Sequence, residues 1–110
     1  MGRFVKGEVV VLPFPFSDLS ATKRRPALVV ASLPGDDVIL CQITSVSHSD
    51  SYAVPIQEAD FVAGSLARPS YVRTDRIFTA DSAIITRVAG QLSRRKLDEI
   101  ITKLVRIFVS

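Results

Sequence analysis

Runs of β-branched and other apolar residues, separated by proline, glycine and aspartate, fill the first half of the chain. Such runs predict buried strands, which we place at residues 8–13, 26–32, 38–44 and 52–56. Pro13 and Pro15 are expected to end the first strand, because proline has no N–H group to give to a strand ladder. The loop that follows, residues 14–23, exceeds the usual ~4–6 residues, and its length favours a functional role.

The middle of the chain contains weaker sequence patterns, which predict a turn and several short elements. Pro34-Gly35-Asp36-Asp37 predicts a turn between the second and third strands. Residues 57–60 are expected to form a single helical turn, and residues 71–73 and 83–88 are expected to be short strands that flank a connection. There is no repeat, low-complexity tract or linker, so a single domain over residues 1–110 is expected.

The hydrophobic period changes near the end of the chain, where apolar residues recur at helical spacing. These residues are Leu97, Ile100, Ile101, Leu104, Ile107 and Phe108. Ser93 is a suitable N-cap, and Leu92 and Leu97 occupy the two positions of a hydrophobic staple. Three cations, Arg94-Arg95-Lys96, stand in the first turn, where the helix dipole prefers anions. Two interpretations remain equally open here, a functional surface and side chains that extend into water.

Five or six short strands followed by one helix predict a mainly β fold, a small barrel or curled sheet with the helix packed on it. Cys41 is the only cysteine, so neither an internal disulfide nor a cysteine-based metal site can form. No apolar run reaches the ~18 residues of a membrane span, and the N-terminus lacks the apolar stretch of a secretory signal. We therefore expect a cytoplasmic protein that does not enter a membrane.

The formal net charge of +3 hides a strong asymmetry along the chain. Residues 1–35 carry a charge of +3, residues 36–67 carry −5, and residues 68–110 carry +5. The two cationic segments, brought together by folding, would form one face that binds a polyanion. Charge alone favours the simpler interpretation of a solvated surface of mixed sign.

Several enzyme classes are excluded by what the chain lacks. It has no glycine-rich phosphate loop, and one cysteine and one histidine cannot make a zinc site without many carboxylates. A serine–histidine–aspartate triad would need His48, which lies in a serine-rich, turn-like stretch. Arginine, carboxylate, hydroxyl and aromatic chemistry remains. These groups suit the cleavage of RNA, which supplies its own 2′-hydroxyl nucleophile and requires a base, an acid and cations, with neither a metal nor a cofactor.

Several motifs, taken in order, resemble the MazF/PemK (Kid) toxins of type II toxin–antitoxin systems. The most specific is Lys23-Arg24-Arg25-Pro26-Ala27-Leu28-Val29-Val30. The others lie at residues 6–10, 13–19, 42–45 and 70–77 and in the C-terminal helix. The resemblance implies an SH3-like barrel of the PemK/CcdB type that forms a homodimer. It also implies sequence-specific cleavage of single-stranded RNA, giving 2′,3′-cyclic phosphate and 5′-hydroxyl ends, and inhibition by a cognate antitoxin protein.

The resemblance also assigns candidate catalytic residues, namely Arg25, Thr44, Arg73 and Asp75. Arg25 matches the arginine before proline that contacts the scissile phosphate, and Thr44 matches a hydroxyl residue that works beside it. Arg73 and Asp75 match a pair with proposed acid and base roles. Because arginine has a pKa above ~12, we prefer charge stabilisation for both arginines and the role of base for Asp75.

Further cationic and aromatic residues are candidates for binding RNA: Lys23, Arg24, Phe16, Tyr71 and Arg76. Phe14, Phe16 and Tyr71 could stack on bases, although packing is the favoured interpretation for the two phenylalanines. Taken without the family, Arg25 is more often an ordinary surface residue and Thr44 a β-former, while a structural ion pair and a functional pair stay equally open for Arg73–Asp75. Two other functions stay open, a non-catalytic CcdB-like gyrase-binding toxin and an inactive SH3-like barrel that only binds RNA or protein.

Overall fold

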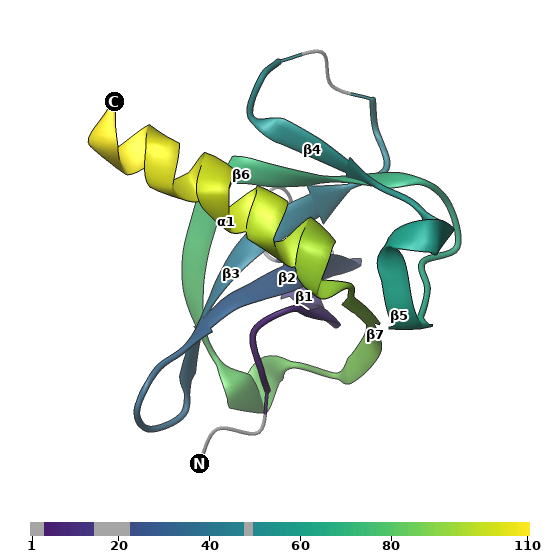
Figure 1. Ribbon diagram of the computed structural model, residues 1–110. Coiled ribbons are helices and arrows are strands. Elements are labelled where there is room, and N and C mark those ends of the chain that lie inside the picture. The colour runs from purple at the N-terminus through teal and green to yellow at the C-terminus, as the bar shows by residue number, and fades with distance from the viewer. Residues whose placement is uncertain (1–3, 15–22, 48–49) are drawn as a thin grey trace.

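The computed structural model describes residues 4–14, 23–47 and 50–110 (Figure 1). In these residues one antiparallel sheet contains seven strands: β1 (Glu8–Phe14), β2 (Lys23–Ser32), β3 (Asp37–Thr44), β4 (Ala53–Ile56), β5 (Phe61–Gly64), β6 (Ser70–Asp81) and β7 (Arg87–Leu92). Their spatial order is β4-β6-β3-β2-β1-β7-β5. One helix, α1 (Arg94–Val109), follows β7, and two short 3-10 turns are η1 (Glu58–Asp60) and η2 (Ser82–Ile84). The predicted mainly β fold with a C-terminal helix is confirmed.

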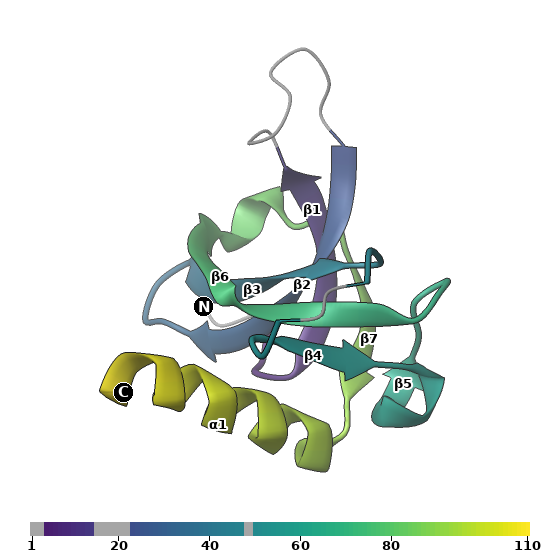
Figure 2. The same ribbon diagram turned by 90° about the horizontal axis from the view of Figure 1, so that it is seen from above.

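The sheet curls around its main core, and α1 lies across the open side of the curl (Figures 1 and 2). From the inner face of the strands this core contains Val9, Leu28, Cys41, Ile43, Val54, Ile56 and Val72. From α1 it contains Leu97, Ile100 and Leu104. Each fully buried aliphatic side chain of this kind contributes roughly 1.5–3 kcal/mol. The helical spacing seen in the sequence marks the face that α1 buries through Leu97, Ile100 and Leu104, but Phe108, which shares that spacing, is 72% exposed.

The start of α1 is built as its sequence predicts. The Ser93 hydroxyl accepts a hydrogen bond from the backbone N–H of Lys96 at 3.2 Å, which satisfies one free donor of the first turn. Two of the three cations of this turn form ion pairs: Arg94 Nε lies 3.2 Å from Asp98 Oδ1, and Lys96 Nζ lies 3.0 Å from Glu99 Oε1. Ion pairs with the next turn thus offset the unfavourable charge next to the helix dipole.

The hairpin of β1 and β2 is longer than predicted. The strand does not stop at Pro13, which lies opposite Arg24, and Phe14 lies opposite Lys23. Phe14 is buried, and its ring packs edge-on against Phe78 with 5.2 Å between centroids. This contact extends the pairing and confirms the packing interpretation of Phe14. As a result, β2 begins at Lys23 and not at residue 26.

The prediction of a short strand at residues 71–73 is wrong, because β6 runs from Ser70 to Asp81. Cys41 of β3 lies opposite Ile77 and Ile43 lies opposite Val72, so residues 73–76 form a bulge opposite the single residue between them. The buried Thr74 holds this bulge, since both its N–H and its hydroxyl donate to the Tyr52 carbonyl, at 3.2 and 2.6 Å. Such bulges redirect side chains and interrupt the alternation on which strand prediction relies.

Two other elements differ from the prediction. Residues 83–88 do not form a strand: the η2 turn comes first, capped by the Asp81 carboxylate, which accepts from Ala83 N at 2.8 Å. Strand β7 starts only at Arg87, and β5 was not predicted. Strands at residues 38–44 and 52–56 and the single turn at 57–60 match β3, β4 and η1 to within one residue.

Candidate active site

A cleft of about 300 Å3 opens where the first residues of β2, the last residues of β3, the segment before β6 and the start of β7 meet. Four arginines and three hydroxyl residues contribute to its lining: Arg24, Arg25, Arg68, Arg87, Thr44, Ser45 and Ser70. No aspartate or glutamate is among the described residues that line it. Arginine forks match phosphate oxygens in charge and geometry, so the cleft is suited to a phosphate-bearing ligand.

The β1–β2 hairpin places Arg25 at this cleft. Arg25 lies opposite Leu12 in the strand pairing, and its side chain is half-buried. Ala27, two residues further along β2, is buried in a second apolar cluster, which also contains Val10, Leu12, Phe14, Val29, Val38 and Leu40, and this burial anchors the strand. The position of Arg25 therefore depends on strand pairing and not on a free loop.

Thr44, at the end of β3, lines the same cleft. Its Oγ1 atom accepts a hydrogen bond from Val46 N at 3.1 Å, which holds the side chain. A hydroxyl that accepts in this way still has its own proton to donate. Thr44 can therefore donate to a phosphate oxygen beside Arg25. The structure brings together these two predicted residues.

Arg73 and Asp75 belong to a separate cluster on the β6 bulge. Arg73 Nη2 lies 3.5 Å from Asp75 Oδ2 and 3.9 Å from Asp50 Oδ2, so two carboxylates bracket one guanidinium. The Arg73 side chain is only 16% exposed, and its buried Nε atom has no hydrogen-bond partner among the described residues. The cluster carries a formal charge of −1, opposite in sign to the cleft.

The two groups occupy neighbouring strands. Arg73 and Asp75 do not line the cleft, but Tyr71 lies opposite Thr44 in the β3–β6 pairing. The pairing of β6 with β4 is regular from Ser70 to Arg73, so side chains alternate there, and Tyr71 and Arg73 point to the same side of β6, away from the buried Val72. Tyr71 thus stands between the cationic cleft and the Arg73 cluster.

The remaining predicted RNA-binding residues are distributed unevenly. Arg24 lines the cleft, and Lys23 is exposed one residue earlier on β2. Arg76 is exposed on the β6 bulge. Phe16 lies outside the described residues, as does His48.

Three charged residues at these sites were missed by sequence reasoning. Arg68 and Arg87 line the cleft, and Asp50 pairs with Arg73. The +5 charge of residues 68–110 was the only signal for the arginines, and it did not distinguish them from other cations. Asp50 lies in the acidic middle segment, and its pairing with Arg73 depends on the contact between β4 and β6.

Cys41 is an unsuitable nucleophile. Burial, reinforced by the negative charge of Asp75, raises the pKa of its thiol to about 12, so the thiolate is scarce at neutral pH. Among residues 4–14, 23–47 and 50–110, no three His, Cys, Asp or Glu side chains gather as a metal site would require. In the same part of the chain, no helix has the length and apolar character needed to cross a membrane.

A curled antiparallel sheet closed by one helix, with an arginine-lined cleft, defines a small mainly β protein of the curled-barrel type. The chain belongs to the PemK-like, MazF-like toxins of type II toxin–antitoxin systems, because the model of this family matches residues 5–108. The predicted family is therefore confirmed. No curated protein sequence matches the chain.

Solved structures share the fold at low sequence identity. An endoribonuclease from Mycobacterial species is 20% identical, with a TM-score of 0.75, and the match covers 98% of this chain and 93% of that one. An endoribonuclease in complex with its cognate antitoxin, also from Mycobacterial species, is 17% identical with a TM-score of 0.73, covering 97% of both chains. MazE-MazF from Deinococcus radiodurans is 21% identical with a TM-score of 0.71, covering 94% of this chain and 93% of that one. The predicted barrel fold is confirmed by these likenesses.

Proposed function

We propose that the chain is an endoribonuclease toxin that cuts single-stranded RNA, messenger RNA in particular, at sites chosen by sequence. The 2′-hydroxyl attacks the adjacent phosphorus, a base takes the hydroxyl proton, and the 5′-oxygen leaves with a proton from an acid. The products are a 2′,3′-cyclic phosphate and a 5′-hydroxyl. The similar structures named endoribonucleases support this activity.

The observation that carries the proposal is the convergence of Arg25 and Thr44 with Arg24, Arg68 and Arg87 on one cleft without carboxylates among its described lining. The transition state concentrates negative charge on the phosphoryl oxygens. Donors that already face this charge lower the barrier, each by roughly 3–4 kcal/mol in well-studied cases. In this proposal arginines supply the charge that a metal ion supplies in other nucleases, so no cofactor is needed.

The base is assigned to the carboxylate cluster on β6, which requires the ribose next to the scissile phosphate to lie between the cleft and the β6 bulge, beside Tyr71. Arg73 is bracketed by Asp50 and Asp75, so its charge is already balanced, and it is less suited to a phosphate than the cleft arginines. We assign Asp75 as the base and Arg73 as the positioning residue that holds it. Asp50 in turn helps to position Arg73. Its Oδ1 atom accepts from Tyr52 N at 2.9 Å and from Ala53 N at 3.1 Å, which leaves Oδ2 facing Arg73.

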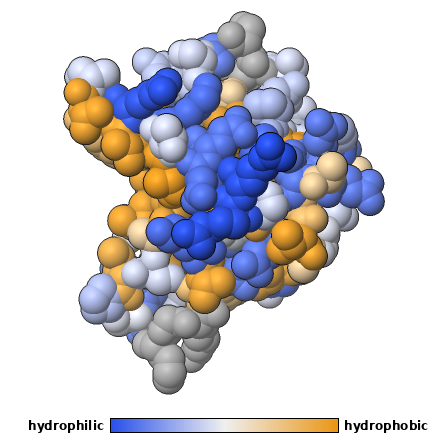
Figure 3. All heavy atoms as spheres, in the orientation of Figure 1, coloured by the Kyte–Doolittle hydropathy of each residue, from blue (hydrophilic) through white to orange (hydrophobic). Residues whose placement is uncertain are grey.

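A homodimer and an antitoxin belong to the same proposal. Three apolar side chains near the end of α1, Val105, Phe108 and Val109, are 51–74% exposed. Figure 3 shows hydrophobic side chains gathered at and below the C-terminal end of α1, beside a hollow in the surface. A second copy of the chain would cover them. The cationic cleft would accept an acidic antitoxin segment in place of RNA, in line with the similar endoribonuclease that was solved with its antitoxin.

The test is incubation of the purified chain with mixed-sequence RNA in EDTA, followed by analysis of the new ends. We expect cuts that carry cyclic phosphate and 5′-hydroxyl groups. Intact RNA at every sequence tested, with a folded protein, would remove the enzymatic assignment. Trapped gyrase complexes would then favour a CcdB-like binder instead.

A further inference from the structure

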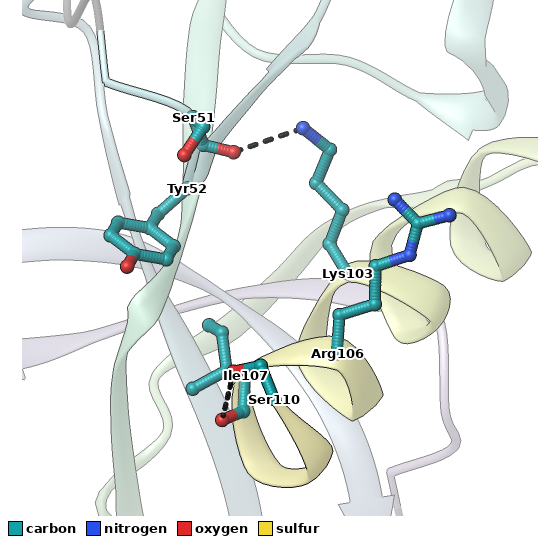
Figure 4. Close-up of a pocket in the computed structure, with 6 residues that line it drawn as sticks. All are labelled: Ser51, Tyr52, Lys103, Arg106, Ile107 and Ser110. Carbon is teal, nitrogen blue, oxygen red and sulfur yellow. Dashed lines mark hydrogen bonds between the residues drawn. The ribbon is translucent and has the colours of Figure 1, made fainter.

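A second hollow lies between the turn before β4 and the last turns of α1. It has a volume of about 270 Å3 and is lined by Ser51, Tyr52, Lys103, Arg106, Ile107 and Ser110. Figure 4 shows Lys103 and Arg106 on one side of this pocket and Tyr52 on the other. Its described lining holds two cationic side chains and no Asp or Glu side chain.

The two cations are available to a ligand. Lys103 Nζ donates to the Ser51 carbonyl at 2.9 Å, and its ammonium group has two further N–H donors. Arg106 is exposed and forms no ion pair with any residue in the described part of the chain. The helix dipole also favours cations near a helix C-terminus. The dipole explains their charge, but not their convergence on a hollow whose opposite wall is aromatic.

Tyr52 supplies that aromatic wall. Its side chain is 46% exposed, while its carbonyl is fixed by the two hydrogen bonds from Thr74. A fixed backbone with a half-exposed ring suits the stacking of an unpaired base, which contributes roughly 1–3 kcal/mol. The combination of one ring and two cations matches a nucleotide, with its base on Tyr52 and its phosphate on Arg106 and Lys103.

The pocket lies close in the sheet to the Arg73 cluster. Ala53 lies opposite Arg73 in the β4–β6 pairing, so Tyr52 is one residue from the strand neighbour of Arg73. Strand β4 is an edge of the sheet, over which an RNA strand leaving the Arg73 cluster can pass. We propose that the pocket of Tyr52, Lys103 and Arg106 is a subsite for a nucleotide of the substrate RNA that flanks the cut. This inference rests on the proposed endoribonuclease function and extends it.

The test measures binding of a fluorescent mixed-sequence RNA whose ribose 2′-oxygens are all methylated, so that it cannot be cut. Tyr52→Ala keeps the backbone carbonyl and should weaken binding on the order of ten-fold, whereas Tyr52→Phe keeps the ring and should bind as the parent does. Arg106→Ala should lower the slope of log affinity against log salt by about 0.7, the value for one phosphate on a single strand. Arg95→Ala is the matched control, because Arg95 is an exposed cation at the other end of α1.

Each outcome decides the proposal. If the parent chain cuts RNA but Tyr52→Ala and Arg106→Ala bind the methylated RNA like Arg95→Ala, the subsite is wrong and the enzymatic function stands. A parent chain that neither cuts nor binds RNA overturns both. If Arg106→Ala loses the same fold of affinity for a poly-glutamate peptide as for RNA, the pocket is a general anion surface and the nucleotide assignment falls.

Discussion

Asp50 faces Arg73 and its own turn with different carboxylate oxygens: Oδ2 lies 3.9 Å from Arg73 Nη2, while Oδ1 accepts the N–H groups of Tyr52 and Ala53. The turn and the ion pair therefore depend on different atoms of one side chain. Removal of the ion pair without loss of the turn is possible, which makes the role of Asp50 in catalysis open to a clean test.

Asp50→Asn keeps an oxygen for the turn and replaces the atom that faces Arg73 with an uncharged NH2 group. We expect the unfolding midpoint to change little and kcat to fall about 10- to 100-fold, because a slightly misplaced base is costly. Single-turnover cleavage and a denaturant titration measure the two quantities. Asp98→Asn is the control, since Asp98 is an exposed carboxylate that pairs with the exposed Arg94 on α1. Equal rates for both variants would show that Asp50 has no part in positioning Arg73.

Asp75→Asn tests the assignment of the base. The amide has nearly the same shape and cannot take a proton, so kcat should fall by about 10²–10⁴-fold with little change in RNA affinity. Cleavage kinetics and binding of methylated RNA separate the two effects. Retained activity would take the role of base away from Asp75.

Arg68 and Arg87 are expected to bind RNA even though neither was singled out from the sequence. Each would form charge-assisted hydrogen bonds of about 1.5–3 kcal/mol with phosphate, so replacement by alanine should lower kcat/KM by about 10- to 100-fold. The exposed Arg95→Ala again provides a control of equal charge. Variants of Arg68 and Arg87 that cut as fast as Arg95→Ala would place the RNA elsewhere.

The pKa of Cys41 predicts how stability depends on pH. In the folded chain burial, and secondarily the charge of Asp75, raises the pKa of the thiol from 9.0 to about 12, so the native state keeps a proton that the unfolded chain loses. The stabilisation is complete below about pH 9 and is lost as pH rises towards 12. Denaturant titrations across this range should show a steeper fall in stability for the parent chain than for Cys41→Ala. Parallel slopes would contradict the raised pKa.

Local patterns in the sequence predicted what depends on local structure. Ser93, Leu97, Ile100 and Leu104 define the start and the buried face of α1 through contacts within a few turns, so spacing was sufficient. The β6 bulge could not be predicted in this way, because Thr74 and the Tyr52 carbonyl that it binds are 22 positions apart. The first strand was predicted to within one residue, but the contact of Phe14 with Phe78 joins positions far apart in the chain and had no local signal.

The candidate site likewise depends on contacts between positions far apart in the chain. Arg25 and Thr44 come from different strands, and only the motifs shared with a known family joined them before the structure was described. No local feature distinguishes Arg68 and Arg87 from the other arginines of the chain. Strand pairing brings Arg87 to the cleft, and Arg68 reaches it from the segment before β6, so sequence spacing contained no signal for either residue.

The most direct measurement is the cleavage of one mixed-sequence RNA by the parent chain and by Arg25→Ala, in EDTA, with analysis of the product ends. The parent chain should give cyclic phosphate and 5′-hydroxyl ends, and Arg25→Ala should cut about 10²- to 10³-fold more slowly while it keeps the same unfolding midpoint. Equal cleavage by the two proteins, or none by the folded parent chain, would contradict the proposal that the arginine-lined cleft is a ribonuclease active site.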